Sequence, residues 1–329
     1  MSPPRPHRRN VLGQLLLLGA GGAAIWAARN HLLWPDPEVA FTGGAASSGW
    51  IDLPARGGLV DLPARIKGVW FRAVVDSGAQ YSAIDAALAQ RLKLPAATPI
   101  PMVAFGVSGQ PSITRSVTLD LDVGDDRAMQ ITGLRAATLN LSPLSGLTAQ
   151  PFSMLLGRDF LRAVAADIDF PRRRAAFFKP DAWTAPQGAV AAPVQMRNGA
   201  LFAAVKVEDA PPVEVMVDTG ATGALALSEE AAQAAGLFDG RDVQRTHSIT
   251  LGGVSQDRIV RAERIGFAGQ VFPDVPVQIY SPSLKAAIPG GLLGLGVLGR
   301  YRVGMDLGRG RLHLQGPAPG PAPARRRRR

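Results

Sequence analysis

One short tract occurs twice in this chain. Residues 74–79 read Val-Val-Asp-Ser-Gly-Ala, and residues 216–221 read Met-Val-Asp-Thr-Gly-Ala. In each copy an apolar run that suits a strand leads into Asp, a small hydroxyl residue, Gly and Ala. A single Asp-Ser-Gly sequence would predict only an ordinary turn. Two copies, each after an apolar strand, predict a duplicated fold that brings two aspartates together.

The repeat continues beyond these two tracts. Leu-Leu-Gly follows at residues 155–157 in the first half and at residues 292–294 in the second. The Gly of this sequence lies 81 residues after Asp76 and 76 residues after Asp218, respectively. Each half also carries a helical signal soon after its tract, at residues 85–92 and 228–237. In the second of these, Ser228 suits a helix N-cap. A repeat of more than about 100 residues is too long for a solenoid unit, so two lobes are expected.

The rest of the body has the pattern of strands. Short apolar or alternating runs separated by Gly, Pro and Asp turns occupy residues 69–75, 116–123, 131–141, 201–207, 213–217, 249–251 and 271–279. Within residues 117–123 Val and Leu alternate with Thr and Asp, which predicts a strand with one buried face. The sequence therefore predicts an all-β protein with lobes at residues 49–180 and 181–315, joined by extended segments near residues 171–195.

Over residues 50–315 this pattern resembles the retropepsin-like and pepsin-like aspartic protease superfamily. The resemblance implies a bilobal aspartic protease fold, with two similar β-barrel-like lobes, a cleft between them and both halves in one monomeric chain. In that family the Leu-Leu-Gly strand threads beneath the active carboxylates. The residues at those places are Leu156, Gly157, Leu293 and Gly294. The second lobe departs from the family pattern, because Leu295 and Gly296 stand where the first lobe has Arg158 and Asp159; the family's Arg is structural.

The chemistry of two facing aspartates explains why both tracts are needed. Two carboxylates about 3 Å apart cannot both ionise, so they share one proton and can act as base and acid on a water molecule and an amide. We expect Asp76 and Asp218 to be the catalytic residues. The residues expected to support their loops are Ser77, Gly78, Ala79, Thr219, Gly220 and Ala221. Neither Ala79 nor Ala221 carries a hydroxyl that could stabilise the ionised pair. We therefore predict a less acidic pH optimum than that of an otherwise equal site with Ser or Thr at these two positions.

Two Gly-bearing segments occur 30 to 35 residues after the aspartates, where the family carries flaps over its cleft. The flap candidates are Gly106, Val107 and Gly109 in the first lobe and Gly252 and Gly253 in the second. Gly-rich hairpin tips suit a lid that opens and closes. The alternative is a surface turn without substrate contact.

These observations favour an aspartic endopeptidase that acts on polypeptide substrates. The alternative is a non-catalytic peptide-binding protein on the same fold, in which an extended peptide adds to a sheet edge without being cut. A third possibility, a Ser-His-Asp hydrolase using His247, lacks a Gly-x-Ser-x-Gly sequence around its nucleophile. No metal is predicted, because the chain has no cysteine and its four histidines lack ligand spacing, and no cofactor is predicted, because no P-loop or dinucleotide-binding motif occurs.

The net charge of +10 comes mostly from the two ends of the chain. Nine of the 36 basic residues lie in residues 1–34 and 325–329, which leaves 27 basic residues against 26 acidic ones in the remainder. A nearly neutral body predicts no nucleic-acid partner. Residues 316–329 read as a disordered Pro/Ala linker and an Arg tail, with contact to anionic lipid or phosphate as the alternative.

The N-terminal segment, residues 1–34, is predicted to be an export signal or a membrane anchor. Arg8 and Arg9 precede an apolar run at residues 11–28, a combination that resembles a twin-arginine signal and is about the length that spans a bilayer. The protein is therefore expected to be periplasmic or anchored to the cytoplasmic membrane. Residues 35–48, rich in Pro, Gly and Ser, read as a linker.

Overall fold

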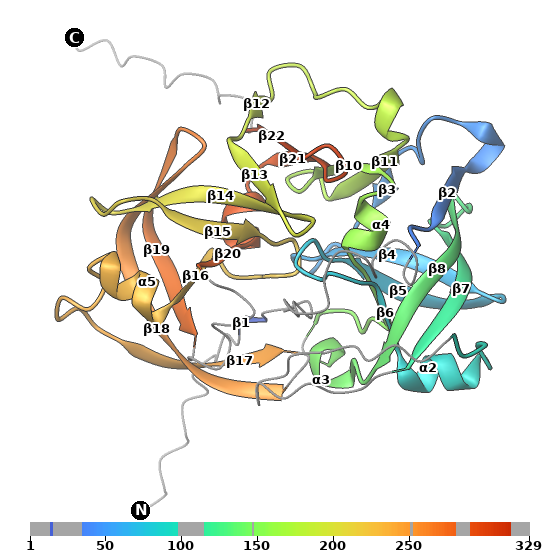
Figure 1. Ribbon diagram of the computed structural model, residues 1–329, viewed down its shortest axis with the longest axis horizontal. Helices are drawn as coiled ribbons and strands as arrows, with labels where there is room; N and C mark the ends of the chain where they lie inside the picture. The colour runs from blue at the N-terminus through green and yellow to red at the C-terminus, as the bar shows by residue number, and fades with distance from the viewer. Residues whose placement is uncertain are drawn as a thin grey trace, which may run out of the picture.

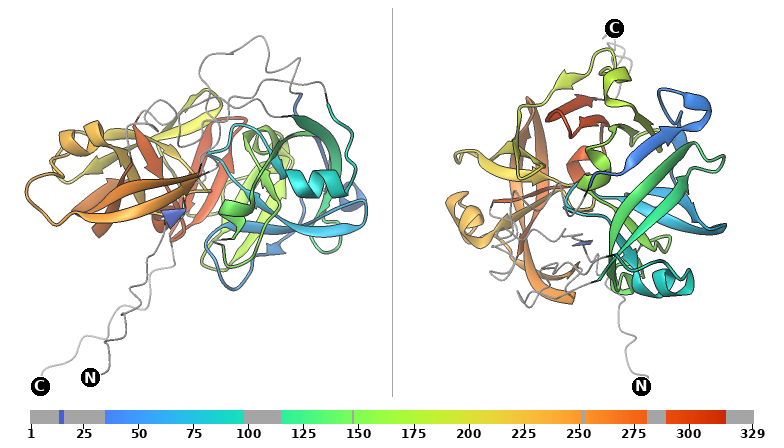
Figure 2. Two further views of the ribbon diagram at one scale, coloured as in Figure 1. Left: turned by 90° about the horizontal axis from the view of Figure 1, so that it is seen from below. Right: turned by 45° about the vertical axis from the view of Figure 1, so that its right-hand side comes forward.

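The computed structural model describes residues 14–15, 35–97, 115–146, 148–250, 253–280 and 290–316. Within them the chain forms two β-rich lobes that lie side by side, with a third sheet that both halves of the chain share (Figure 1). Figure 2 shows the two lobes and the shared sheet from two further sides. The prediction of an all-β, bilobal fold is confirmed.

The first lobe is a seven-stranded sheet with the order β2-β8-β6-β9-β5-β4-β7. Its strands are β2 (Glu38–Phe41), β4 (Val60–Ile66), β5 (Val69–Val75), β6 (Ala83–Asp85), β7 (Ser116–Val123), β8 (Met129–Leu139) and β9 (Met154–Leu156). Lys67 and Gly68 both have positive φ between β4 and β5, as a tight hairpin turn requires. Helix α2 (Ala86–Arg91) begins after Asp85, whose carboxylate accepts hydrogen bonds from two backbone N–H groups in its first turn.

The second lobe is a nine-stranded sheet with the order β1-β17-β18-β19-β16-β20-β15-β14-β13. Its strands are β1 (Gln14–Leu15), β13 (Val194–Arg197), β14 (Ala200–Val207), β15 (Val213–Val217), β16 (Leu225–Ser228), β17 (Gln244–Thr250), β18 (Gly253–Phe267), β19 (Gln270–Tyr280) and β20 (Gly291–Leu293). Helix α5 (Glu229–Ala234) follows its predicted cap, Ser228, whose hydroxyl accepts a hydrogen bond from Ala231 N. The two predicted helices are therefore present at corresponding places in the two lobes.

The third sheet joins the two halves of the chain. It has the order β12-β22-β21-β10-β11-β3. Its strands are β3 (Ile51–Asp52), β10 (Ala165–Asp169), β11 (Arg174–Phe178), β12 (Val190–Ala191), β21 (Arg302–Asp306) and β22 (Arg311–Gln315). The antiparallel pair β10–β21 is the seam between the half that carries the first tract and the half that carries the second.

A partly buried ion pair crosses this seam. Arg302 donates to the carboxylate of Asp167 from Nε at 2.7 Å and from Nη2 at 2.6 Å. The Asp167 side chain is only 3% exposed, whereas the Arg302 side chain is 24% exposed. Arg302 also lies over the ring of Trp50, 5.1 Å from its centroid.

We expect Arg302→Met to lower the free energy of unfolding by about 3 kcal/mol, because Asp167 would stay buried without its partner. Urea denaturation measures the change. The control is Arg197→Ala, which removes an ion pair whose two side chains are 49% and 45% exposed and should cost less than about 1 kcal/mol. Equal effects of the two substitutions would contradict the prediction.

Two details of the fold differ from the sequence-based expectations. The segment at residues 35–48, predicted to be a linker, contributes β2, which pairs with β8 in the first lobe, and the 3₁₀ turn Thr42–Gly44. Three further one-turn helices were not predicted: α3 (Ser142–Ser145), α4 (Arg158–Leu161) and α6 (Leu295–Leu298). The turns α4 and α6 are too short to give a periodic apolar pattern.

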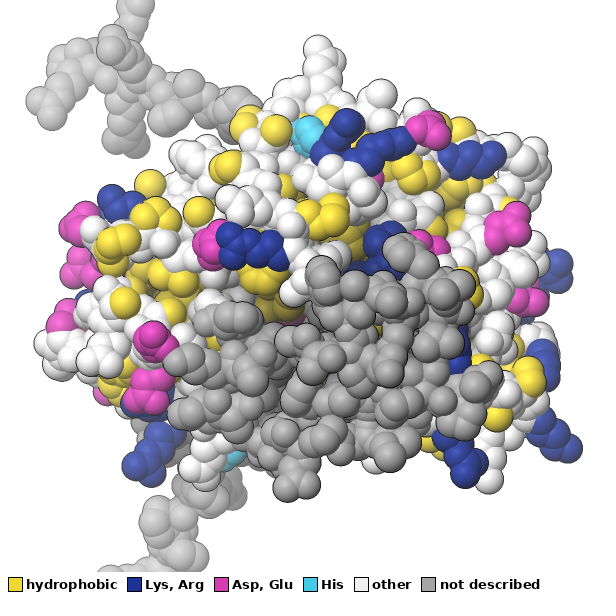
Figure 3. All heavy atoms as spheres, in the orientation of Figure 1, with side chains coloured by type: hydrophobic (Ala, Val, Ile, Leu, Met, Phe, Trp, Pro, Cys, Tyr) yellow, Lys and Arg dark blue, Asp and Glu magenta, His cyan; other side chains and the backbone are white. Residues whose placement is uncertain are grey.

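Several predictions fall on the undescribed parts of the chain. Apart from β1, residues 1–34 lie outside the described residues, as does the tail after residue 316. No helix within the described segments is long and apolar enough to cross a membrane. On the face seen in Figure 3, Lys and Arg side chains are interspersed with acidic and apolar ones over the described atoms.

Candidate active site

The two Asp-containing loops leave their sheets in the same way. Strand β5 runs parallel to β9, with Val75 opposite Leu156, and β15 runs parallel to β20, with Val217 opposite Leu293. At the end of each pair the next residue is the aspartate. Asp76 N donates to Leu156 O and Asp218 N donates to Leu293 O, both at 2.9 Å. The Leu-Leu-Gly strands therefore fix where each aspartate begins, as the sequence repeat predicted.

The glycines after these strands allow the chain to pass under the loops. A Cβ on Gly157 would lie 2.7 Å from the carbonyl carbon of Tyr81, and a Cβ on Gly294 would lie 2.5 Å from Ala221 O. Because real Cβ atoms do not approach backbone so closely, only glycine fits at these two positions. The following residues then donate their backbone N–H groups to the loops, Arg158 to Ala79 O at 2.9 Å and Leu295 to Ala221 O at 2.8 Å.

The hydroxyl residues of the two loops bind each other's backbone across the lobes. Ser77 Oγ donates to Val217 O at 2.9 Å and accepts from Thr219 N at 3.0 Å. Thr219 Oγ1 donates to Val75 O at 2.9 Å and accepts from Ser77 N at 3.0 Å. These four reciprocal hydrogen bonds are buried and leave no donor of either hydroxyl unused. They hold the loops of the two lobes at one fixed separation.

The glycine of each loop faces the aspartate of the other. A Cβ on Gly78 would lie 2.5 Å from Asp218 Oδ2, and a Cβ on Gly220 would lie 2.6 Å from Asp76 Oδ1. The backbone of each loop thus packs directly against the opposite carboxylate. Neither glycine has positive φ, so close approach rather than unusual backbone geometry requires a residue without a side chain.

Both carboxylates are fully buried. Asp76 and Asp218 are each 0% exposed. Asp76 Oδ1 accepts hydrogen bonds from Gly78 N at 2.8 Å and Ala79 N at 3.0 Å, and Asp218 Oδ1 accepts from Gly220 N at 2.8 Å. Within the described structure the Oδ2 atom of each aspartate has no partner with hydrogen-bond geometry. The backbone therefore orients one oxygen of each carboxylate and leaves the other oxygen for chemistry.

Burial and mutual repulsion disfavour the charged forms of this pair. Loss of solvation, followed by the negative charge of Asp218, raises the pKa of Asp76 well above 3.8. Loss of solvation also raises the pKa of Asp218, to about 6, against the backbone N–H of Gly220, which lowers it. Since the two groups interact strongly, the protons belong to the pair rather than to either residue. Above the pKa of Asp218, about 6, the pair therefore holds one proton and one negative charge.

The two alanines that follow the glycines place methyl groups, not hydroxyls, beside the loops. Ala79 and Ala221 are each 2% exposed. We expect the double substitution Ala79→Thr and Ala221→Thr to shift the pH-rate profile downward by about half a pH unit, because an added hydroxyl can donate to the ionised carboxylates. The profile of kcat/KM against pH measures the shift. An unmoved profile in a folded double variant would contradict the prediction.

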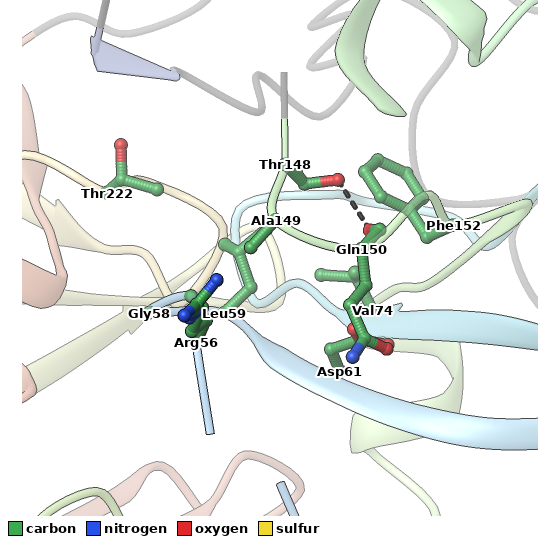
Figure 4. Close-up of a pocket in the computed structure, with 11 residues that line it drawn as sticks. Arg56, Gly58, Leu59, Asp61, Val74, Thr148, Ala149, Gln150, Phe152 and Thr222 are labelled. Atoms are coloured by element: carbon green, nitrogen blue, oxygen red, sulfur yellow. Dashed lines mark hydrogen bonds between the residues drawn. The ribbon is translucent and has the colours of Figure 1, made fainter. Parts of the chain in front are cut away.

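A small pocket, partly open to solvent, lies beside the two loops (Figure 4). The first lobe contributes most of its wall, and Thr222, four residues after Asp218, contributes from the second lobe. The lining residues are Arg56, Gly57, Gly58, Leu59, Asp61, Val74, Thr148, Ala149, Gln150, Phe152 and Thr222. Val74 lies two residues before Asp76 on β5, which places the pocket next to the candidate site.

The structure brings together most of the residues that the sequence singled out. The two aspartates, the Ser77 and Thr219 hydroxyls and the four glycines at positions 78, 157, 220 and 294 form one buried cluster with Leu156 and Leu293. Of the flap candidates, residues 106, 107, 109 and 252 lie outside the described residues, and Gly253 begins β18 opposite Thr250 of β17. His247 is exposed on β17. Among the described residues no group of three or more His, Asp or Glu side chains could hold a metal ion.

Two features of the site were not predicted. Asp159 is fully buried and accepts hydrogen bonds from the backbone N–H and the hydroxyl of Ser82, while Ser82 Oγ accepts from Gly157 N. In the second lobe Gly296 stands in place of Asp159, and a Cβ there would lie 2.7 Å from Ala224 N. The first lobe therefore secures its loop with a polar network and the second with close backbone packing. The departure from the family pattern at residues 295–296 was the signal for this difference.

Comparisons with known proteins identify the family to which both lobes are similar. The sequence profile of a family described as "Aspartyl protease" matches the chain twice, over residues 62–160 and 203–299, once in each lobe. No curated protein matches the chain at a significant level. Among solved structures, one similar chain is a retropepsin-like aspartic protease from Rickettsia conorii, at 22% sequence identity and a TM-score of 0.30, covering 39% of this chain and 89% of that one.

Proposed function

The chain belongs to the aspartyl protease family, and we propose that it is an endopeptidase that cuts polypeptides with a water molecule activated by Asp76 and Asp218. One observation carries the proposal: two fully buried aspartates, one from each lobe, lie in loops locked together by the Ser77 and Thr219 hydrogen bonds. Holding two ionisable carboxyl groups out of water is unfavourable, because burial disfavours their charged forms. An arrangement that costs stability and has good geometry is typical of a site kept for its chemistry.

The proposed reaction uses the single proton of the pair. The ionised carboxylate takes a proton from water as the water oxygen attacks the amide carbon, and the protonated carboxyl gives its proton to the carbonyl oxygen. The resulting tetrahedral intermediate then breaks its C–N bond as the nitrogen takes up the proton of the pair, and one hydroxyl of the intermediate returns a proton to the other carboxylate, which leaves a carboxylic acid and an amine. The pair ends the cycle as it began, with one proton and one charge. The backbone N–H groups on the two Oδ1 atoms keep the carboxylates oriented throughout.

The pocket beside the site gives this proposal a place for a substrate side chain. Leu59, Val74 and Phe152 supply an apolar part of its wall, which suits an aliphatic or aromatic side chain. The residues of one lobe and Thr222 of the other would then bind the same substrate. Such a site favours an extended polypeptide, because an extended backbone presents successive side chains to opposite faces.

A peptide-binding protein without catalysis remains the second candidate. The same pocket and sheet edges would serve it. It has no need of two facing carboxylates, however, and binding alone does not explain why both loops exclude any side chain at Gly78 and Gly220. The two candidates differ in one measurable respect, which is whether bound peptides are cut.

The experiment is cleavage of a mixed peptide library by the full chain between pH 3 and pH 8. Wild type is compared with Asp76→Asn and Asp218→Asn, and pepstatin is used as a probe of aspartic protease sites. Cleavage that is lost in each single variant and blocked by the inhibitor supports the proposal, and the cut sites give the specificity. Peptides that bind without being cut, equally in all three proteins, would establish the binding protein instead.

A further inference from the structure

A buried arginine behind the candidate site has no counterpart in the other lobe. Arg158 and Leu295 occupy corresponding places, since each follows the glycine of a Leu-Leu-Gly strand, begins a one-turn helix and donates its backbone N–H to the last Ala of a loop. Leu295 is an ordinary buried apolar residue. Arg158 puts a guanidinium into the protein at 5% exposure. The site therefore has a positive charge on one side only.

This guanidinium is poorly partnered by its surroundings. Within the described part of the chain Arg158 forms no ion pair with a carboxylate, and its Nε has no hydrogen-bond partner. Its one hydrogen bond, from Nη1 to Asn198 O, is long at 3.5 Å. The neighbouring carboxylate, Asp159, is occupied by Ser82. A buried cation with so few partners is strongly unfavourable unless a negative charge lies nearby.

The charged groups around Arg158 identify that negative charge. Asp76 and Asp218 both favour its protonated form, Tyr81 does so weakly, and the positive charge of Arg162, on the same helical turn, disfavours it. Burial lowers the pKa of Arg158 only to about 10, so the side chain stays charged throughout the acidic and neutral range. The interaction is reciprocal, because the charge of Arg158 lowers the pKa of Asp218, in addition to the stronger effects of the Gly220 and Ala221 N–H groups.

We propose that Arg158 is a positioning residue for the reaction, whose buried charge stabilises the singly ionised form of the Asp76–Asp218 pair. It contacts neither substrate nor water in this role, and acts through the two carboxylates. Burial disfavours the first ionisation of the pair, and one cation behind the loops offsets part of that effect. A cation in both lobes would favour loss of the second proton as well, which the chemistry does not allow, and Leu295 in the second lobe is consistent with this.

The test is the pH dependence of Arg158→Met and Arg158→Gln beside Arg158→Lys. Because a lost positive charge disfavours the anionic form, the acid limb of kcat/KM should move up by about one pH unit in the two neutral variants, with a roughly tenfold loss of activity on that limb. Arg158→Lys should keep the wild-type profile. Leu295→Met, an apolar exchange at the corresponding place, is the matched control and should not move the limb. An unmoved limb in a folded neutral variant would overturn the proposal and leave Arg158 a purely structural residue.

A second measurement separates this inference, which rests on the proposed function for its kinetic arm, from that function itself. Carbon-13 NMR of labelled aspartate carboxyls follows the titration of the pair directly, with Asp76→Asn and Asp218→Asn assigning the signals. The titration should move to higher pH in Arg158→Gln and remain in place in Arg158→Lys, whether or not the protein cuts peptides. Thermal unfolding of each variant confirms that it is folded. If the wild type is inactive but the titration shifts in Arg158→Gln, the endopeptidase is rejected and the role of Arg158 is kept. If the wild type is active and the titration does not shift in Arg158→Gln, the endopeptidase is kept and the role of Arg158 is rejected.

Discussion

Asp76→Asn is expected to abolish peptide hydrolysis and at the same time to raise the free energy of unfolding at neutral pH. The amide can neither take a proton from water nor share one with Asp218, so kcat/KM should fall by at least about 10³-fold. The same change removes one of two carboxylates that are fully buried and face each other. Few substitutions of a buried polar residue are expected to stabilise a protein, which makes the combination diagnostic.

The direction of the stability change follows from the pKa values of the pair. Both aspartates titrate above 3.8 in the folded protein, so between about pH 4 and the folded pKa values the folded state binds more protons than the unfolded state. The pair therefore contributes full stability only in acid and loses it as the pH rises. For Asp218 alone, a pKa of about 6 corresponds to a loss on the order of 3 kcal/mol by neutral pH. The raised pKa of Asp76 adds a further loss at neutral pH, and Asp76→Asn removes this part because the amide does not titrate.

Thermal or urea unfolding at pH 7 and at pH 3 measures the effect. The variant should be more stable than wild type by about 1–3 kcal/mol at pH 7 and by nearly nothing at pH 3, where the carboxyls of the pair are largely protonated in both the folded and the unfolded state. The control is Asp125→Asn, which changes an exposed aspartate in a turn and should affect neither activity nor stability. A variant that is inactive and equally destabilised at both pH values would show that Asn packs badly there, and would remove the argument from charge.

The local part of the site could be predicted from the sequence because its residues are contiguous in the chain. An apolar strand, Asp, a hydroxyl residue and Gly occur together, and the structure uses them together: Ser77 and Thr219 bridge the loops, and Gly78 and Gly220 admit the opposite carboxylate. The Leu-Leu-Gly strands were predictable for the same reason, since their repeat spacing marked them as a second common element.

The non-local part could not be predicted in the same way. The seam β10–β21 pairs residues more than a hundred positions apart, and no periodicity indicates which distant strand will be the neighbour. Residues 35–48 contain the Pro, Gly and Ser of a linker, yet the segment Glu38–Phe41 within them adds to a sheet edge, where backbone hydrogen bonds matter more than side-chain pattern. The role of Arg158 depends on which charges surround it in space. Its sequence position next to Asp159 suggests a simple pair, yet Asp159 binds Ser82 instead.

Gly220→Ala is expected to have the second largest effect, although it adds a single methyl group. That methyl would lie 2.6 Å from both Cγ and Oδ1 of Asp76, well inside van der Waals contact. Asp76 cannot easily retreat, because its Oδ1 is held by the N–H groups of Gly78 and Ala79. The lobes must therefore separate or the carboxylate must turn, and either movement breaks the geometry of the pair. A displacement of about 1 Å at a reacting group can cost roughly 10²-fold in rate, and overpacking typically costs about 1–3 kcal/mol in stability.

The measurement is kcat/KM and the urea midpoint of Gly220→Ala beside Gly78→Ala and Gly266→Ala. The methyl group of Gly78→Ala would lie 2.5 Å from Asp218 Oδ2. This variant should behave like Gly220→Ala, because the two loops are related by the repeat. Gly266→Ala lies in β18 of the second lobe, where the nearest atom to the new methyl is at 3.6 Å, and should leave both quantities unchanged. Because none of the three glycines has positive φ, the comparison isolates close approach from backbone strain. Normal activity in Gly220→Ala would mean that the two loops are not held at this separation during turnover, and the reciprocal hydrogen bonds of Ser77 and Thr219 would then not determine the geometry of the pair.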